Sequence, residues 1–233
     1  VVVNLSLDQV GEKHDEIRGI PHNFEKSMRT LEILKALRAE YRNFTVGIHT
    51  VVSNFNVDQI AEIYDALIHL GADSYITEIA EERVELGTMG AGITPPLEKY
   101  TKAIDFLSDR IREQHFSGIG RITRAFRLNY YKMVKQVLKE KRQIIPCYAG
   151  IASAQISPDG DVWPCCIRAE SMGNLREAGY DFKKIWNSPA ANAMRKSIKD
   201  KECYCPLANA SYTNMLMDMP TMCKVGIKFL LGK

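Results

Sequence analysis

The chain lacks an apolar run long enough to cross a lipid bilayer, and it lacks the charged start and cleavage site of a secretory signal peptide. A membrane-spanning helix needs roughly 20 consecutive apolar residues, and a signal peptide joins a short apolar core to those two features. We therefore expect a cytoplasmic protein with no membrane partner. Strong net charge is also missing, because the formal charge is +3 over 233 residues, which implies no particular partner.

One segment does carry an excess of positive charge. Residues 121–142 contain eight basic side chains and a single acid, Glu140. Apolar residues recur among them at helical spacing, so we expect a surface helix with a solvated basic side. Such a stretch can also bind nucleic acid or an anionic substrate, but the apolar face favours the first interpretation, and nucleic acid is not an expected partner.

Cysteine is not scarce, and its placement is informative. The six cysteines all lie in the last 90 or so residues: Cys147, Cys165, Cys166, Cys203, Cys205 and Cys223. Without an export signal the chain meets a reducing environment, where clustered cysteines are more often metal ligands or redox groups than disulfides. The sequence therefore disfavours a disulfide framework.

A short hairpin is predicted between two of these cysteines. Residues 154–157 and 161–163 flank a Pro-Asp-Gly turn at 158–160, and such a turn supplies a fixed φ followed by a residue that tolerates positive φ. The hairpin would bring Cys147 and Cys165 close together. With Cys203 and Cys205 they form a thiolate set that suits either zinc or an iron-sulfur cluster, and spacing alone does not separate the two.

Two other cysteines are less clear. Cys166 competes with Cys165 as a ligand, and we favour Cys165 because of its spacing from Gly160. Cys223 fits a small buried apolar residue as well as it fits a functional one.

The first half of the chain alternates strands with helices. Strands are predicted at 1–7, 44–52 and 72–79, and helices at 24–41, from a capping box at Asn56 and Gln59 to Gly71, and at 97–112. This order predicts parallel pairing, hence an α/β layer or a piece of an α/β barrel, with the site at the C-terminal strand ends. After Pro146 we expect short strands and turns, and we place a domain boundary between residues 143 and 144.

These residues resemble a known family. The spacing Cys147, Gly160, Cys165, followed by Met-Gly-Asn-Leu at 172–175, Ile-Trp-Asn-Ser at 185–188 and Cys203-Tyr-Cys205, resembles the SPASM/twitch auxiliary-cluster domain of radical S-adenosylmethionine (radical SAM) enzymes. Residues 6–8 with 14–19, and residues 51–57, look like the fourth and fifth strands of the radical SAM barrel with their following segments.

The resemblance implies an α/β fold. Residues 1–143 would form the C-terminal portion of a partial (β/α) radical SAM barrel, and residues 144–233 a small cysteine-rich SPASM/twitch domain with a β-hairpin. The family's Cys-x3-Cys-x2-Cys motif, which holds the cluster that cleaves S-adenosylmethionine, does not occur in this chain. The start without Met, in what reads as a buried strand, suggests a chain cut from something longer, and the chain alone would not be competent.

The resemblance also implies the function and cofactors. It implies a radical SAM oxidoreductase or maturase that reductively cleaves S-adenosylmethionine, abstracts hydrogen from a peptide or small-molecule substrate, and receives electrons from a donor protein. One auxiliary 4Fe-4S cluster would be bound by Cys147, Cys165, Cys203 and Cys205; S-adenosylmethionine and a second 4Fe-4S cluster are expected in the full-length protein. The alternative is a non-catalytic module that binds zinc or a cluster.

Candidate S-adenosylmethionine contacts follow from the same resemblance. They are Ser6, Arg18 and Asn54, whose alternative roles are strand-end turn chemistry for Ser6 and Asn54 and an ion pair with Asp15 or Glu16 for Arg18.

Four residues with ionisable side chains carry weaker expectations. Asp8 sits at the first strand end and is a candidate substrate contact, and Glu78 and Glu81 are candidate proton acceptors, although solvated carboxylates are commoner. For His14 we expect a hydrogen-bonded loop histidine rather than a metal ligand.

Overall fold

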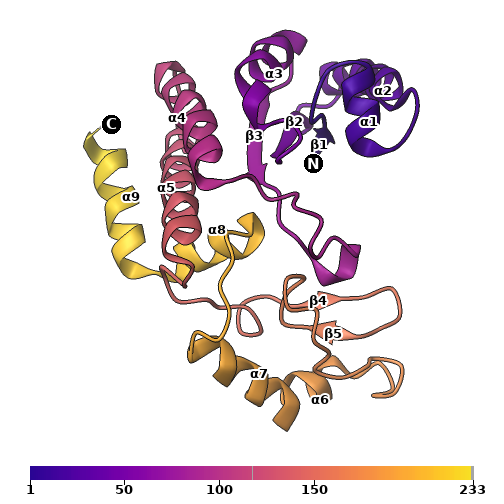
Figure 1. The fold of residues 1–233 in the computed structure, drawn as a ribbon, viewed down its shortest axis with the longest axis vertical. Coiled ribbons are helices and arrows are strands. Elements are labelled where there is room, and N and C mark those ends of the chain that lie inside the picture. Colours follow the sequence, from indigo (N-terminus) through magenta and orange to yellow (C-terminus); the bar gives the residue numbers. More distant parts are fainter. Residues whose placement is uncertain (117, 232–233) are drawn as a thin grey trace. The chain divides into compact units, whose positions relative to one another are not determined.

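The chain packs into two compact units (Figure 1). The computed structural model describes residues 1–116 and 118–231. The first unit comprises Val1–Ala80 and Ile93–Arg110, and the second comprises Glu81–Gly92 and the chain from Ile111 onward. This division places residues 111–143 in the same unit as the cysteine region. The domain boundary between residues 143 and 144 stays a prediction.

The first unit is built on a small parallel sheet. Its elements in chain order are β1 (Val2–Ser6), α1 (Glu12–Arg18), α2 (Asn23–Glu40), β2 (Thr45–Val52), η1 (Val57–Gln59), α3 (Ile60–Leu67), η2 (Ile68–Leu70), β3 (Ser74–Ile79) and the first part of α4 (Leu97–Glu113). The strand order is β1-β2-β3 and both pairings are parallel. The predicted alternation of strands and helices is therefore confirmed, together with the α/β fold class.

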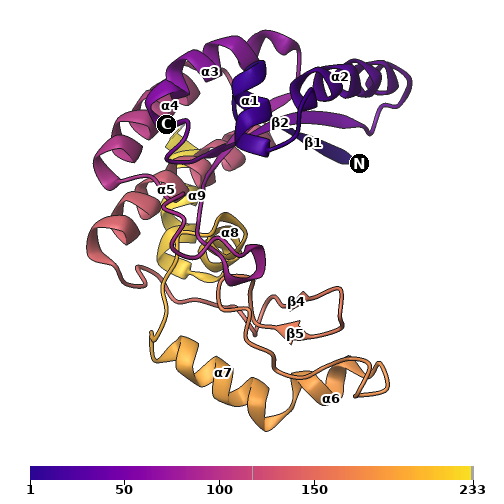
Figure 2. The same cartoon turned by 45° about the vertical axis from the view of Figure 1, so that its right-hand side comes forward.

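The central strand of this sheet is largely buried. Its run Val46, Gly47 and Ile48 is buried, which is typical of the near-continuous apolar runs of parallel strands. Figure 2 shows α2 running alongside β1 and β2. The helix α3 turns its apolar side inward, and its Tyr64 ring meets that of Tyr75 edge to face at 5.3 Å.

The second unit is mainly helical. It contains η3 (Val84–Leu86), α5 (Ile119–Glu140), β4 (Gln155–Ile156), β5 (Val162–Trp163), α6 (Phe182–Trp186), α7 (Pro189–Lys199), α8 (Ala208–Met217) and α9 (Met219–Leu231). The short strands expected after Pro146 are present as β4 and β5, and the structure adds the helices α6 to α9, which were not predicted. The helix α7 begins at a Ser-Pro pair, where the Oγ of Ser188 accepts a hydrogen bond from the Ala191 N–H at 3.1 Å, so a local capping signal was present in the sequence.

An apolar cluster lies under the hairpin of the second unit. It consists of Val162, Met172, Ile185 and Ala191, all buried, with Trp186 and four other side chains packed around them. This packing contributes to the stability of the region, since fully burying a large aliphatic side chain is worth about 1.5–3 kcal/mol.

The basic helix α5 is less solvated than its sequence suggests. The side chain of Arg127 is buried, and the guanidinium of Arg121 donates to the Phe229 carbonyl oxygen at 2.5 Å and lies over the Phe229 ring. Tyr130 is fully buried and stacks on Tyr212. The prediction of a solvated basic side is therefore wrong at Arg121 and Arg127. Fewer basic side chains of α5 are then exposed to bind nucleic acid or another anionic ligand. None of the described helices has the length and apolar character needed to span a bilayer.

Candidate functional site

The predicted hairpin is present and ends just before Cys165. Strands β4 and β5 pair antiparallel, with Ile156 opposite Val162. The Ser157 N–H donates to the Asp161 carbonyl oxygen at 2.9 Å, and the Asp161 N–H donates to the Ser157 Oγ at 3.0 Å. Gly160 adopts a φ of 94° at the turn, a conformation that glycine reaches without strain.

Four cysteines from three segments line one pocket, which we call the cysteine pocket. Its cysteines are Cys147, Cys165, Cys203 and Cys205, and its wall includes Arg168 and apolar side chains from the end of α5 and the segment that follows. These are the four cysteines predicted as ligands. The structure brings them together, while their role as ligands stays a prediction.

A buried glutamine, which the sequence reading missed, positions one of these segments. The Nε2 of Gln143 donates to the carbonyl oxygens of Ile198 at 3.0 Å and Cys203 at 2.9 Å. The amide thereby fixes the chain between α7 and Cys203 against the end of α5. A second buried amide, that of Asn214 on α8, accepts from the Tyr148 N–H at 2.8 Å, next to Cys147.

Burial raises the pKa of three thiols of the cysteine pocket, those of Cys165, Cys203 and Cys205. The N–H groups of Arg168 and Ile167 oppose this effect at Cys165 by favouring the thiolate. At Cys205 the pKa lies well above its usual value of 9.0, and the nearby charge of Glu81 raises it further. Cysteine binds a metal as the thiolate, so metal binding is coupled to proton release.

The adjacent Cys166 lies elsewhere. Its side chain is buried but is not among the described residues that line the cysteine pocket. Desolvation raises the pKa of Cys166, and the charges that act on it come first from Arg83 and Glu85. The choice of Cys165 rather than Cys166 as the ligand stays a prediction. Cys223 is exposed on α9.

Four cysteines can serve a single zinc ion or a polynuclear iron-sulfur cluster, and the two need different arrangements. Among the described residues, no group of three or more His, Cys, Asp or Glu side chains is arranged to hold one metal ion. A tetrahedral zinc site needs four ligand atoms within about 2.3 Å of one point. A cluster spreads its four thiolates over different iron atoms, so cysteines around a shared pocket suit it without converging on one point.

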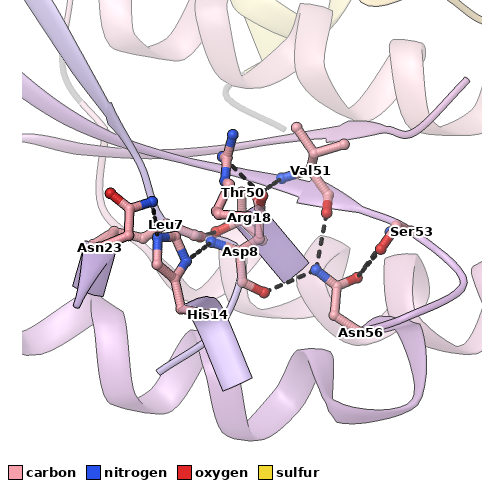
Figure 3. A network of polar contacts seen from close by, with 9 residues as sticks. All are labelled: Leu7, Asp8, His14, Arg18, Asn23, Thr50, Val51, Ser53 and Asn56. Carbon is pink, nitrogen blue, oxygen red and sulfur yellow. Dashed lines mark hydrogen bonds and ion pairs between the residues drawn. The ribbon is translucent and has the colours of Figure 1, made fainter. Parts of the chain in front are cut away.

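In the first unit, a polar network joins the C-terminal ends of β1 and β2 (Figure 3). The Oδ1 of Asp8 accepts from the Val51 N–H at 2.8 Å, and its Oδ2 pairs with Arg18 Nη2 at 2.7 Å. The buried Asn56 donates through Nδ2 to the carbonyl oxygens of Asp8 at 2.8 Å and Val51 at 2.9 Å, and its Oδ1 accepts from the Ser53 N–H at 2.8 Å. Both carboxylate oxygens of Asp8 thus have partners within the unit.

His14 belongs to the same network. It is fully buried in α1, not in a loop as expected, and its Nδ1 accepts from the Asp8 N–H at 3.2 Å. Desolvation lowers the pKa of His14 from 6.5. The expected hydrogen-bonded role is present, and the neutral imidazole is the form that this acceptor role requires.

The three candidate S-adenosylmethionine contacts lie close to these strand ends. Ser6 is the last residue of β1 and is exposed, and Asn54 is exposed two residues beyond β2, with its N–H donating to the Ile93 carbonyl oxygen at 2.8 Å. Arg18 ends α1 and pairs with Asp8, not with Asp15 or Glu16. Their contact with S-adenosylmethionine stays a prediction.

The candidate proton acceptors differ in exposure. The Oε1 of Glu78 lies 3.6 Å from Nε2 of His49, and both side chains are partly exposed. Glu81 is buried, at 7% exposure, so it is not the solvated carboxylate that we regarded as commoner.

Comparisons with known proteins place the cysteine region in a family. Residues 147–206 match SPASM, described as an iron-sulfur cluster-binding domain. The chain is 27% identical over 198 residues to an AdoMet-dependent heme synthase of Oleidesulfovibrio alaskensis, covering 78% of this chain and 47% of that protein. It is 24% identical over 221 residues to the antilisterial bacteriocin subtilosin biosynthesis protein AlbA of Bacillus subtilis, covering 89% and 43%.

A solved structure has the same fold. It is described as native anSMEcpe with bound AdoMet and Kp18Cys peptide, and it superposes with a TM-score of 0.56 at 16% identity, covering 84% of this chain and 53% of that one. The chain spans about half the length of the curated relatives it matches.

Proposed function

We propose that this chain, which is similar to radical SAM proteins and matches SPASM over residues 147–206, forms the auxiliary-cluster part of a radical SAM oxidoreductase or maturase. The observation that carries this proposal is the cysteine pocket, whose four thiols come from the segment matched to SPASM. In this proposal Cys147, Cys165, Cys203 and Cys205 bind one 4Fe-4S cluster.

The residues around the pocket suit this role. A bound 4Fe-4S cluster supplies a one-electron acceptor or relay whose potential depends on ligation, burial and hydrogen bonds to sulfur. The N–H groups of Ile167 and Arg168 favour the Cys165 thiolate, and that of Leu207 favours the Cys205 thiolate. Gln143 holds the Cys203 backbone, and apolar side chains limit access of water to the sulfurs.

The strand ends of the first unit are proposed to bind S-adenosylmethionine. Ser6 and Asn54 present exposed side chains at the ends of adjacent strands, and Arg18 carries a guanidinium that suits a carboxylate. Arg18 forms an ion pair with Asp8, and the Arg18 side chain remains 32% exposed. Asp8 is therefore proposed to orient Arg18 rather than to contact substrate.

The substrate is proposed to be a peptide or a small molecule. The relatives include enzymes named for heme synthesis and one named for subtilosin biosynthesis, and the solved structure holds a peptide. An electron donor protein is the expected partner, because reductive cleavage of S-adenosylmethionine consumes an electron.

Anaerobic reconstitution with iron and sulfide tests the cluster. We expect about four iron and four sulfide per chain with visible thiolate-to-iron absorption, loss of iron in Cys165→Ala, and near-complete retention in Cys166→Ala and Cys223→Ala. A colourless protein that instead binds one zinc tightly through the same cysteines would favour the non-catalytic module and contradict the proposal.

Equilibrium dialysis with labelled S-adenosylmethionine tests the strand ends. In this chain, Arg18→Met should weaken binding more than Arg29→Met, a matched change at an exposed arginine of α2 that pairs with Glu25. Equal affinities would remove Arg18 from the proposed site.

A further inference from the structure

Arg168 is the one side chain with a formal charge among the described residues lining the cysteine pocket. Its neighbours in that wall are thiols, aliphatic groups, neutral amides and hydroxyls. We propose that Arg168 is a positioning residue that raises the reduction potential of the auxiliary cluster. This inference rests on the proposed function, because it requires a cluster on the four cysteines.

The guanidinium is held on its outer side by two partners. Its Nε and Nη2 pair with the two oxygens of Glu170 at 2.6 and 2.9 Å, and Nη1 donates to the Ser197 Oγ at 2.5 Å. The turn after Cys165 and the helix α7 therefore fix its orientation, and fork-to-carboxylate pairing adds directional precision.

The ion pair does not cancel the charge that the pocket receives. The side chain of Arg168 is 17% exposed, whereas that of Glu170 is 51% exposed. Water screens the carboxylate more strongly than the inward guanidinium. The guanidinium is therefore the less screened of the two charges.

The side chain of Arg168 lies beside the proposed ligands. It lines the same pocket as the four cysteines, and it hydrogen-bonds with Cys203. Its charge therefore lies close to at least one of the sulfurs that would bind the cluster.

The electrostatic consequence has a definite sign. One-electron reduction adds one negative charge to the cluster and its thiolates, the electron coming from an external donor, and it breaks no bond. A nearby fixed cation stabilises the more negative state. Arg168 therefore shifts the equilibrium toward the reduced cluster.

Redox titration of the reconstituted protein, followed by electron paramagnetic resonance, tests the proposal. In Arg168→Met we expect the ratio of reduced to oxidised cluster at a fixed potential to fall about tenfold, a shift of about 59 mV for one electron. Arg168→Lys should restore a large part of the shift, because it keeps the charge. Arg176→Met is the matched control, since Arg176 is exposed and donates to the Pro158 carbonyl oxygen on the outside of the hairpin.

A fourth variant separates charge from structure. Glu170→Gln breaks the same ion pair but leaves the cation, so its potential should equal or exceed that of the wild type. If Arg168→Met and Glu170→Gln both lower the potential, or if Arg168→Met leaves it unchanged, the inference is wrong. Failure of the proposed function would look different, because the wild-type chain would then assemble no iron-sulfur cluster at all.

Discussion

Replacing Asn56 gives the sharpest test of how the first unit is held together. Its buried side chain makes three hydrogen bonds to backbone groups, two to the carbonyl oxygens of Asp8 and Val51 and one from the Ser53 N–H. It thereby ties the segment after β1 to the end of β2, where the candidate S-adenosylmethionine contacts lie. Each such bond contributes about 1 kcal/mol net.

The size of the effect follows from that count. Asn56→Ala removes all three bonds and leaves their partners without a side-chain partner, so the free energy of unfolding should fall by about 3 kcal/mol. Asn56→Asp keeps the size of the side chain but places an acceptor against two carbonyl oxygens. We therefore expect Asp to destabilise at least as much as Ala.

Native-state hydrogen exchange on peptides covering β1 and β2 measures this locally. Tryptophan fluorescence is unsuitable, because both tryptophans, Trp163 and Trp186, lie in the second unit. Asn54→Ala is the matched control, as Asn54 is exposed, and it should change the opening free energy by less than about 0.5 kcal/mol. A cost below about 1 kcal/mol for Asn56→Ala, or wild-type stability for Asn56→Asp, would refute the reasoning.

Three further predictions concern the hairpin, the buried histidine and the buried glutamine. Gly160→Ala places a Cβ 3.3 Å from the Asn174 Oδ1 at a φ of 94°. It should lower the free energy of unfolding by about 1–3 kcal/mol and reduce the iron retained per chain on reconstitution. Full iron retention with an unchanged melting temperature would contradict this prediction. The pKa of His14 lies below 6.5 in the folded state, so the unfolded chain takes up the proton first as the pH falls. The free energy of unfolding should therefore drop in urea titrations from pH 7.5 to 5. His14→Gln should flatten this pH dependence, and an equally steep dependence in the variant would contradict the prediction. Gln143→Leu leaves two buried carbonyl oxygens without their donor, which should cost about 2 kcal/mol in urea titrations followed by tryptophan fluorescence; a cost near zero would show that water replaces the amide.

The sequence predicted the α/β half of the fold well because its pattern is regular. The strand β2 and the inward side of α3 follow simple hydrophobic periods, and Gly71 ends the helical stretch in a left-handed conformation as expected. The helix α1 was missed because it has seven residues, most of them charged, so it shows no apolar period. The buried residue of this helix is His14, whose contacts are with Asp8, Asn23 and Phe24, all outside the helix.

Side-chain partners were harder to predict than elements. Asn56 and Gln59 match a capping box, but the Oδ1 of Asn56 accepts from Ser53 and the Oε1 of Gln59 accepts from the Gln9 amide. The four pocket cysteines were found because their spacing is restrictive, whereas Gln143 and Arg168 carry no local signal. Their roles depend on α7 and on the chain after Cys165 folding back toward α5, which is a tertiary event.

The apolar cluster beneath the hairpin has a consequence for biogenesis. In the smallest metal-dependent folds, metal binding supplies the free energy of folding, and the apo chain is disordered. Here Val162, Met172, Ile185 and Ala191 already pack together, and buried amides hold the cysteine segments. These contacts involve no cysteine side chain, so the loss of an iron-sulfur cluster by oxidation would leave them intact.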